Sequence, residues 1–288
     1  MMEYALEVNH LTKSYKDFQI KDINIKIPKG TILGLIGENE AGKSTIINTI
    51  LNIARKDAGE IKIFNQDVYK FERAVKEDIA VIFDECHFNP YFKVKVIGKM
   101  MSKIYKNWDH ETYLSYLEKF NLPKDKKIKD FSKGMKMKLS FAVAFSHHPK
   151  LLILDEATSG LDPIVRDEIL EILKDFIMDD ERAVLISSHI TSDLDKIADY
   201  ISFIHEGELL FTKTYEDIQD NYGILRCGKE LFDALDKNEI VTYKKETFEY
   251  QVLIDNRQEF SKIYQDAVIE KADIEALMLF YIRGERLS

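Results

Sequence analysis

A short loop at residues 37–45 limits the possible folds of this chain more than any other feature. Its sequence is Gly-Glu-Asn-Glu-Ala-Gly-Lys-Ser-Thr. The continuous apolar run at residues 31–36 predicts a buried parallel strand before the loop, and residues 44–53 have helical character. The pattern G-x-x-x-x-G-K-[ST] between a strand and a helix is typical of a phosphate-binding loop. We therefore expect a nucleotide-binding α/β protein.

The residues of this loop have separate chemical roles. Glycines allow successive backbone N–H groups to surround phosphates, and the following helix offers its N-terminal amides to the same anion. Lys43 supplies positive charge to the β- and γ-phosphates, and the hydroxyl of Ser44 is a ligand for Mg²⁺. The residues that we expect to bind the nucleotide here are Gly37, Glu38, Asn39, Glu40, Ala41, Gly42, Lys43, Ser44 and Thr45.

Two acidic residues, Asp155 and Glu156, follow a second apolar segment at residues 151–154. A core strand there would bring both carboxylates to the edge of the sheet where α/β proteins bind ligands. Asp155 would then belong to the Mg²⁺ shell, and Glu156 would polarise the attacking water as a general base. Many strands end in Asp-Glu at a helix cap, so this pair has functional meaning only together with the phosphate-binding loop.

The rest of the chain alternates between strand and helix patterns. The first thirty residues predict strands, with mainly alternating apolar positions at Ile20, Ile23, Ile25 and Ile27. Further strands are expected at residues 5–8, 60–64, 78–83, 151–154, 183–187 and 200–204. Helices are expected at residues 94–105, 111–120, 132–146, 163–177 and 191–198. A mostly parallel core sheet with a helical insertion at about residues 88–148 is the simplest arrangement.

After residue 220 the pattern weakens. The segments expected to be ordered there are residues 225–235, 248–254, 257–265 and 274–283. We therefore expect a nucleotide-binding domain at residues 1–220 and a small α/β accessory region at residues 221–288.

Composition excludes several classes of protein. A formal net charge of −9 argues against a nucleic-acid binder that acts through bulk positive charge. Residues 1–5 lack the basic start and apolar core of a secretory signal, and no apolar stretch approaches the about 20 residues that cross a bilayer. Any membrane role is thus expected to come through a partner. Cys86 and Cys227 lack metal-ligand spacing and are expected to be reduced thiols of a cytosolic protein.

Four further segments complete a specific pattern. Residues 131–135 read Phe-Ser-Lys-Gly-Met, residues 159–162 Ser-Gly-Leu-Asp, and residues 187–189 Ser-Ser-His, and Tyr15 lies ahead of the loop. With the loop and the Asp-Glu pair, they make the chain resemble the nucleotide-binding subunit of an ATP-binding-cassette (ABC) transporter over about residues 3–212. The four would correspond to the signature loop, the D-loop, the switch histidine and the aromatic residue that stacks on adenine.

The resemblance implies a fold, a reaction and roles for single residues. It implies the ABC-ATPase variant of the P-loop NTPase fold, with an antiparallel β subdomain at the N-terminus, and ATP and Mg²⁺ as cofactors. It also implies Ser44, Asp84 and Asp155 as metal ligands. Lys43, Glu156 and His189 would be the catalytic residues.

Two such subunits would close head to tail over two ATP molecules. Ser132 and Gly134 would then contact the γ-phosphate held by the other subunit. A plain helix cap remains an alternative role for Ser132, and core packing for Tyr15. The run of lysines at residues 124–138 is either a solvated helical face or, at Lys133, positive charge beside the partner's phosphates.

The chain departs from the family pattern at four positions. Glu40 replaces a glycine that the family nearly always has, which places a Cβ where a positive φ is expected and a carboxylate near the triphosphate. We expect weakened or conditional ATP binding from it. Asp84 replaces the usual glutamine, Met135 the polar end of the signature, and Ala157 the proline after the Asp-Glu pair.

Residues 83–85, 132–135 and 193–200 are most similar to ATPase subunits of bacterial exporters that have separate permease chains. The expected function is thus an ATPase that acts as a homodimer or with a paralogous subunit. It would drive an integral membrane permease from the cytoplasmic face of the cell membrane. A hydrolytically impaired regulatory module is the alternative, supported by Glu40 and Asp84. A soluble cassette of DNA repair or translation is disfavoured, because neither a long coiled-coil insertion nor a second cassette is present.

Overall fold

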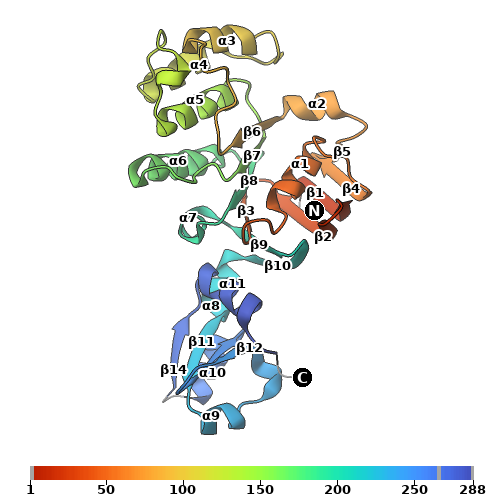
Figure 1. Cartoon of the computed structure of the whole chain (residues 1–288), viewed down its shortest axis with the longest axis vertical. Helices are drawn as coiled ribbons and strands as arrows, with labels where there is room; N and C mark the ends of the chain where they lie inside the picture. The colour runs from red at the N-terminus through yellow and green to blue at the C-terminus, as the bar shows by residue number, and fades with distance from the viewer. Residues whose placement is uncertain (1–2, 265–266, 287–288) are drawn as a thin grey trace.

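The computed structural model describes residues 3–264 and 267–286. The described chain is elongated, with a helical insertion at one end, a central sheet in the middle and a separate C-terminal sheet at the other end (Figure 1). Residues 1 and 2 of the N-terminal segment, residue 265 of the expected element 257–265, and the last two residues of the accessory region lie outside the described residues. In the part of the chain that is described, no helix combines the length and apolar character needed to cross a membrane.

The central sheet has six strands in the order β10-β9-β3-β8-β7-β6. Its strands are β3 (Ile32–Ile36), β6 (Ile79–Phe83), β7 (Leu151–Asp155), β8 (Ala183–Ser188), β9 (Tyr200–His205) and β10 (Glu208–Thr214). Strands β3, β6, β7, β8 and β9 are parallel, and β10 pairs antiparallel with β9. Every residue of β3, β7 and β8 is buried, as expected for parallel strands covered on both faces.

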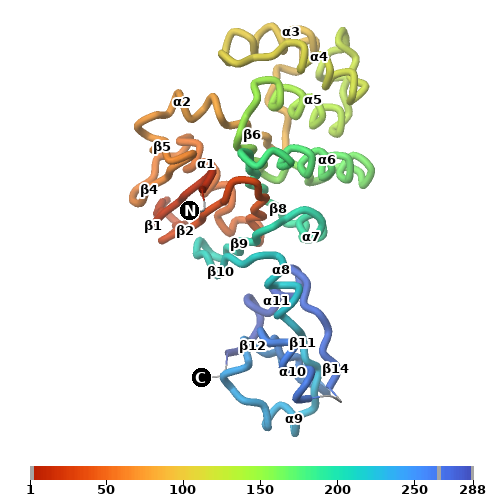
Figure 2. Tube along the Cα trace, turned by 180° about the vertical axis from the view of Figure 1, so that it is seen from behind, coloured from red at the N-terminus to blue at the C-terminus, as the bar shows by residue number. Residues whose placement is uncertain are grey.

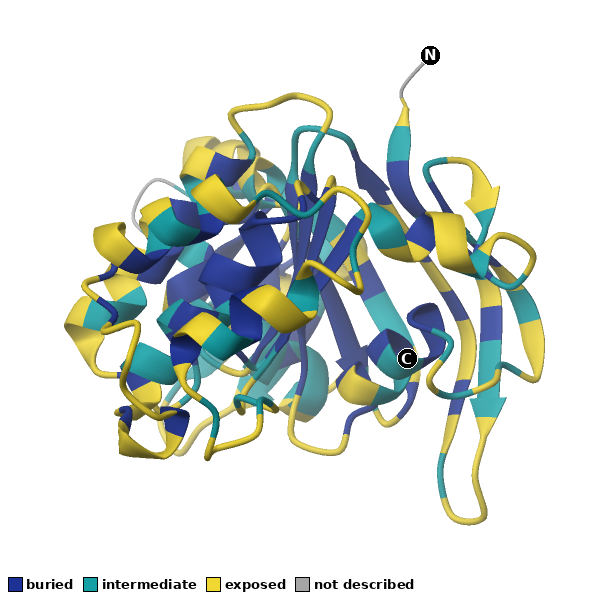
Figure 3. Cartoon of the chain, turned by 90° about the horizontal axis from the view of Figure 1, so that it is seen from above, coloured by how far each residue is buried: buried dark blue, intermediate teal, exposed yellow. Residues whose placement is uncertain are grey.

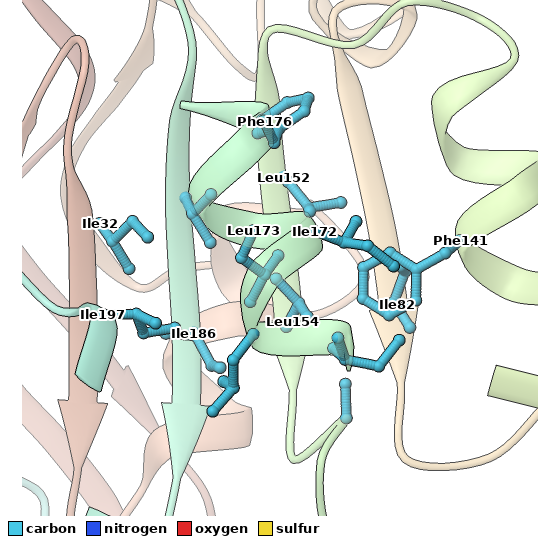
Figure 4. Packing of buried hydrophobic residues seen from close by; sticks show 14 of the residues in the cluster. Ile32, Ile82, Phe141, Leu152, Leu154, Ile172, Leu173, Phe176, Ile186 and Ile197 are labelled. Carbon is cyan, nitrogen blue, oxygen red and sulfur yellow. The ribbon is translucent and has the colours of Figure 1, made fainter. Parts of the chain in front are cut away.

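The two faces of the central sheet pack into separate cores. Alternate residues of β3 divide between them, with Ile32 and Ile36 on one face and Leu33 and Leu35 on the other. On the first face, α5 (Lys133–Phe145) and α6 (Pro163–Phe176) cover the strands with side chains such as Phe141 (Figure 4). The buried strands lie at the centre, and exposed residues occupy the outer helices and loops (Figure 3).

The second face is covered by α1 (Lys43–Ile50) and by an antiparallel sheet of order β2-β1-β4-β5. These strands are β1 (Tyr4–Ser14), β2 (Gln19–Pro28), β4 (Ala58–Ile63) and β5 (Gln66–Asp67). The predicted apolar residues of β2 are indeed all buried against this core. The short helix α2 (Glu72–Glu77), which the sequence did not predict, leads from this sheet into β6.

The helical insertion contains α3 (Val94–Met101), α4 (His110–Lys119), a 3-10 turn at Ile128–Asp130, and α5. All three helices were predicted, but α3 ends before the predicted residue 105. Helix α4 begins where Asp109 accepts hydrogen bonds from the backbone N–H groups of Glu111 and Thr112. Helix α6 begins in the predicted way, at Asp162 followed by proline.

A four-stranded antiparallel sheet of order β12-β13-β11-β14 forms the C-terminal part. The strands are β11 (Gly223–Cys227), β12 (Ile240–Lys245), β13 (Tyr250–Ile254) and β14 (Val268–Lys271). The helices are α7 (Thr191–Ile197) and α8 (Tyr215–Asn221) at the junction, then α9 (Lys229–Ala234), α10 (Arg257–Ile263) and α11 (Ile274–Arg283). The expected element 225–235 is in fact a strand and a helix separated by Gly228.

Helix α11 joins the C-terminal sheet to the central one. It lies beside α8 at the junction in both views of the backbone (Figures 1 and 2). Leu277 and Phe280 of α11 belong to the same buried cluster as Phe203 of β9 and Phe211 of β10. One hydrophobic core therefore continues across residue 220.

Candidate nucleotide-binding site

A cavity of about 1200 Å³ opens at the carboxyl edge of the central sheet. Parallel pairing brings the ends of β3, β7 and β8 together there, because Ile36 pairs with Ser188 and Asp155 with Ser187. Residues from these strand ends and from the phosphate-binding loop line the cavity. They include Glu38, Asn39, Glu40, Ala41, Gly42, Lys43, Ser44, Thr45, Asp84, Glu156, Ser159 and His189. Sites of α/β proteins are expected at this edge.

The loop folds tightly between β3 and α1. The backbone N–H of Ala41 donates to the Glu38 carbonyl at 3.2 Å. Gly42 precedes α1 with φ 116°, a conformation that favours glycine, and no side chain caps the helix. A Cβ on Gly37 would lie 2.4 Å from the Ile204 carbonyl oxygen, so that position also requires glycine. The uncapped amides of α1 are therefore available to an anion.

Lys43 lies almost fully buried beneath the loop. Its Nζ donates to the carbonyl oxygens of Gly37 at 2.8 Å and Glu38 at 3.0 Å. The same Nζ is 3.3 Å from Glu156 Oε1. The ammonium is thus held where the helix begins, and its charge is balanced by the predicted general base.

Glu156 links the lysine to the predicted switch histidine. Its Oε2 lies 2.5 Å from Nδ1 of His189, and its backbone N–H donates to Ser187 Oγ at 3.0 Å. Its φ of 54° is unusual for a residue that is not glycine, and such strained backbones concentrate at functional sites. Glu156 is therefore in direct contact with both of the other predicted catalytic residues, Lys43 and His189.

Two of the three expected metal ligands reach the cavity. Ser44 and Asp84 are exposed and line it, whereas Asp155 lies behind Glu156 and accepts a hydrogen bond from Ser187 Oγ at 2.7 Å. Within residues 3–264 and 267–286, no group of three or more His, Cys, Asp or Glu side chains could by itself hold a metal ion. One hydroxyl and one or two carboxylates fit Mg²⁺, which takes its remaining ligands from water and phosphate. Ser187 was missed from the sequence as the residue that orients Asp155.

The adenine side of the site is only partly as expected. Tyr15 is 51% exposed, so core packing is excluded for it. It does not line the cavity, and Lys13 Nζ lies 5.2 Å from its ring centroid. Phe18 and His205, which the sequence did not single out, do line the cavity. Stacking of Tyr15 on adenine stays a prediction.

Ser132 and Gly134 lie away from the cavity at the start of α5. Ser132 Oγ accepts from the backbone N–H of Met135 at 3.2 Å, so it does act as a helix cap. A Cβ on Gly134 would lie 3.1 Å from Val165, which explains a small residue there. The structure of one chain does not bring these residues to the site of Lys43.

Comparison with known proteins identifies the family. A family model described as ABC transporter matches residues 20–159. The lantibiotic transport ATP-binding protein SrtF of Streptococcus pyogenes is 35% identical over 247 residues, which cover 83% of this chain and 99% of that protein. The chain belongs to the ABC transporter ATP-binding subunits. The bacitracin transport ATP-binding protein BcrA of Enterococcus faecalis is 34% identical, over 73% of this chain and 69% of that protein.

A solved structure confirms the ABC ATPase fold. The ATP-binding subunit of an ABC transporter superposes with a TM-score of 0.69 at 26% identity, covering 75% of this chain and 92% of that one. The C-terminal sheet is an addition to this fold. The predicted family, the fold class and the ATPase activity are thereby confirmed, and family membership implies ATP binding and membrane partners.

Among the departures from the family pattern, Glu40 has a strained backbone and an exposed carboxylate in the structure. Its φ is 66°, so a side chain occupies a backbone conformation that favours glycine. Its carboxylate is exposed and lines the nucleotide cavity. Both features foreseen from the sequence, a strained backbone and a negative charge beside the phosphates, are present.

Proposed function

We propose that this chain binds MgATP in the cavity and hydrolyses it, and that it works as a homodimer or with a paralogous subunit to drive an integral membrane permease in export. The observation that carries the hydrolytic part is the contact of Glu156 with both Lys43 and His189 at the end of β7. This contact places a candidate base, Glu156, beside a candidate phosphate-binding cation, Lys43, and beside the imidazole of His189.

The proposed mechanism begins with a change of partners at Lys43. Its Nζ now neutralises Glu156, and a triphosphate on the amides of α1 would compete for that charge. Once Lys43 turns to the phosphates, Glu156 can accept a proton from water while His189 Nδ1 keeps the carboxylate in place. Mg²⁺, held by Ser44, Asp155 and Asp84, would neutralise charge on the phosphates.

An apolar groove supports the proposed coupling to a permease. It has a volume of about 980 Å³ and lies between α2, β6 and the segment after α3. Phe71, Ile53 and Ile104, which are 55%, 65% and 61% exposed, line it, and Phe83, beside Asp84, lines its far wall. We propose that an amphipathic segment of the permease places its apolar face there, which would hold the chain at the cytoplasmic face of the membrane.

The transported compound is proposed from the relatives. The names of SrtF and BcrA assign those proteins to lantibiotic and bacitracin transport. Both compounds are peptide antibiotics, and a peptide-like or antibiotic compound is the substrate class that we propose for this chain.

The substitution Glu156→Gln tests the hydrolytic assignment. An amide cannot accept the proton from water, so we expect MgATP turnover to fall by at least about a hundredfold while nucleotide binding persists. The matched control is Glu118→Gln on the exposed surface of α4, which should leave turnover unchanged. Turnover that is unchanged in Glu156→Gln would refute its role as the base.

The strained Glu40 favours a second candidate, a nucleotide-binding regulatory module with impaired hydrolysis. Titration with a fluorescent ATP analogue and a phosphate-release assay separate the two functions. Binding without phosphate release, with the permease present, would favour the regulator over the motor.

A further inference from the structure

The nucleotide cavity of this chain is lined by more carboxylates than lysines. Among the described residues its lining includes two lysines, Lys21 and Lys43, and Lys43 is already 3.3 Å from Glu156. The carboxylates that line it are Asp17, Glu38, Glu40, Asp84, Glu156, Glu206 and Glu208. The negative charge of these carboxylates weakens the binding of a triphosphate unless a group outside the cavity supplies positive charge.

Of the two carboxylates in the phosphate-binding loop, Glu40 is the one without a partner in the described part of the chain. Glu38 lies 3.3 Å from His205, and Glu156 is held by Lys43 and His189. The exposed side chain of Glu40 has no hydrogen bond or ion pair in the described part of the chain. It is nevertheless kept in a strained conformation, with φ 66°. A residue with a strained backbone and no partner in its own chain is expected to contact a group on another molecule.

Lys133 is the matching cation on another surface. It is the exposed first residue of α5, a 13-residue helix with no acidic side chain in its first turn. Lys138, further along the helix, pairs with Glu168, whereas Lys133 has no such partner among the described residues. Its Nζ lies 3.0 Å from where a Cβ of Gly160 would be, next to Ser159 of the cavity wall. The positive end of α5 adds to its charge.

In its own chain Lys133 lies beside Asp84 at the edge of the nucleotide cavity, but it does not line that cavity and makes no ion pair with Glu40 among the described residues. A head-to-tail pair of chains, as in the proposed function on which this inference rests, would place each α5 start against the other chain's phosphate-binding loop. We propose that Glu40 of one copy pairs with Lys133 of a second copy. The partner subunit is then another copy of this chain, and Lys133 of one copy compensates the negative charge of Glu40 in the other.

Charge exchange tests this pairing. The two single variants, Glu40→Lys and Lys133→Glu, are purified separately and then mixed in equal amounts. A double variant has both substitutions in one chain. Each single variant places like charges at both interfaces, so we expect MgATP turnover and ATP-dependent dimer mass, measured by light scattering, to fall about tenfold. In the heterodimers that the mixture forms, and in the double variant, both interfaces again have opposite charges. Both readouts should then return to within about twofold of the unmodified chain.

Folding defects do not explain such a result. Lysine meets the same backbone strain as glutamate at position 40, and glutamate at a helix N-terminus is favourable for the helix. The control is Lys136→Glu, which changes the same charge one turn further into α5. Mixed with Glu40→Lys, it should give no recovery.

Three outcomes would overturn the pairing. The first is single variants that behave like the unmodified chain. The second is recovery in the double variant but not in the mixture, which would indicate a contact within one chain. The third is no turnover and no dimer for the unmodified chain with MgATP, in which case the proposed function is wrong and the pairing falls with it. Normal turnover and dimerisation of the unmodified chain without recovery in the mixture would refute the pairing alone.

Discussion

At the scale of single residues, the site is a chain of contacts in which every catalytic candidate already has a partner. Ser187 connects the candidate base to Asp155, because its Oγ donates to Asp155 and accepts from the backbone N–H of Glu156. It is fully buried. The hydroxyl therefore orients both the carboxylate of Asp155, the proposed metal ligand, and the backbone of the proposed base.

We predict that Ser187→Ala lowers turnover about threefold to tenfold and raises the Mg²⁺ concentration needed for half-maximal turnover. The reason is the loss of the buried hydrogen bonds of Ser187 to Asp155 and Glu156, which we expect to cost about 0.7–1.4 kcal/mol of transition-state stabilisation. Turnover measured across a magnesium titration checks this. Ser202→Ala removes another fully buried hydroxyl, one that bonds Thr212 away from the site. It should leave the magnesium dependence unchanged, and an equal shift in both variants would contradict the orienting role.

At the scale of elements, sequence predicted those parts of the fold and site that rest on local chemistry. The helix at Asp162 and the loop before α1 follow from capping and glycine geometry, and both are present. The sequence did not predict α2, β10 or the contacts of Phe18 and His205 with the cavity. These features depend on tertiary packing, which the local sequence pattern does not reveal. Residues 225–235 were predicted as one element, since alternation in so short a segment does not reveal the break at Gly228.

Helix α4 offers a prediction with a defined pH range. The backbone N–H and hydroxyl of Thr112, and then His148, lower the pKa of Asp109 to about 2. Because the folded pKa lies below the ordinary value of 3.8, this charge stabilises the folded state above about pH 4 and the contribution is lost as pH falls toward 2. We expect Asp109→Asn to be less stable than the unmodified chain near pH 6.

Urea unfolding at a series of pH values measures this difference. The gap in free energy of unfolding between the two chains should narrow steadily as the pH is lowered from 5 toward 3, where unfolding still gives a clear transition. A gap that stays constant over that range would show that the cap acts through geometry alone and not through its charge.

At the scale of the whole molecule, the hydrophobic core joins parts that the sequence separates. The ring centroid of Phe211 on β10 lies 4.9 Å from that of Tyr281 on α11 and 5.5 Å from that of Phe203 on β9. Helix α11 of the accessory region therefore packs on β10, an edge strand of the central sheet that is separated from β3 by β9. We therefore expect a change in the packing of α11 to alter the free energy of unfolding of the ATPase core.

We predict that Phe280→Ala lowers the free energy of unfolding of the whole chain by about 3–5 kcal/mol, because it leaves a cavity in the shared core. Phe280 is 2% exposed, whereas Phe248 at the β12–β13 turn is 95% exposed. Phe248→Ala is thus a matched control with an expected change below about 0.5 kcal/mol. Thermal unfolding that separates into two transitions in Phe280→Ala, with the first part alone affected, would argue against a continuous core.

The strand order of the central sheet has a consequence for synthesis. Strand β3 lies between β8 and β9, which are made roughly 150 residues later. While the ribosome is still producing the helical insertion, β3 has both edges open and the loop after it has no wall from Ile204. The phosphate-binding loop therefore emerges well before the strands that complete its surroundings. Until His205 leaves the exit tunnel, the nascent chain presents an unpaired apolar strand that must be shielded from its neighbours.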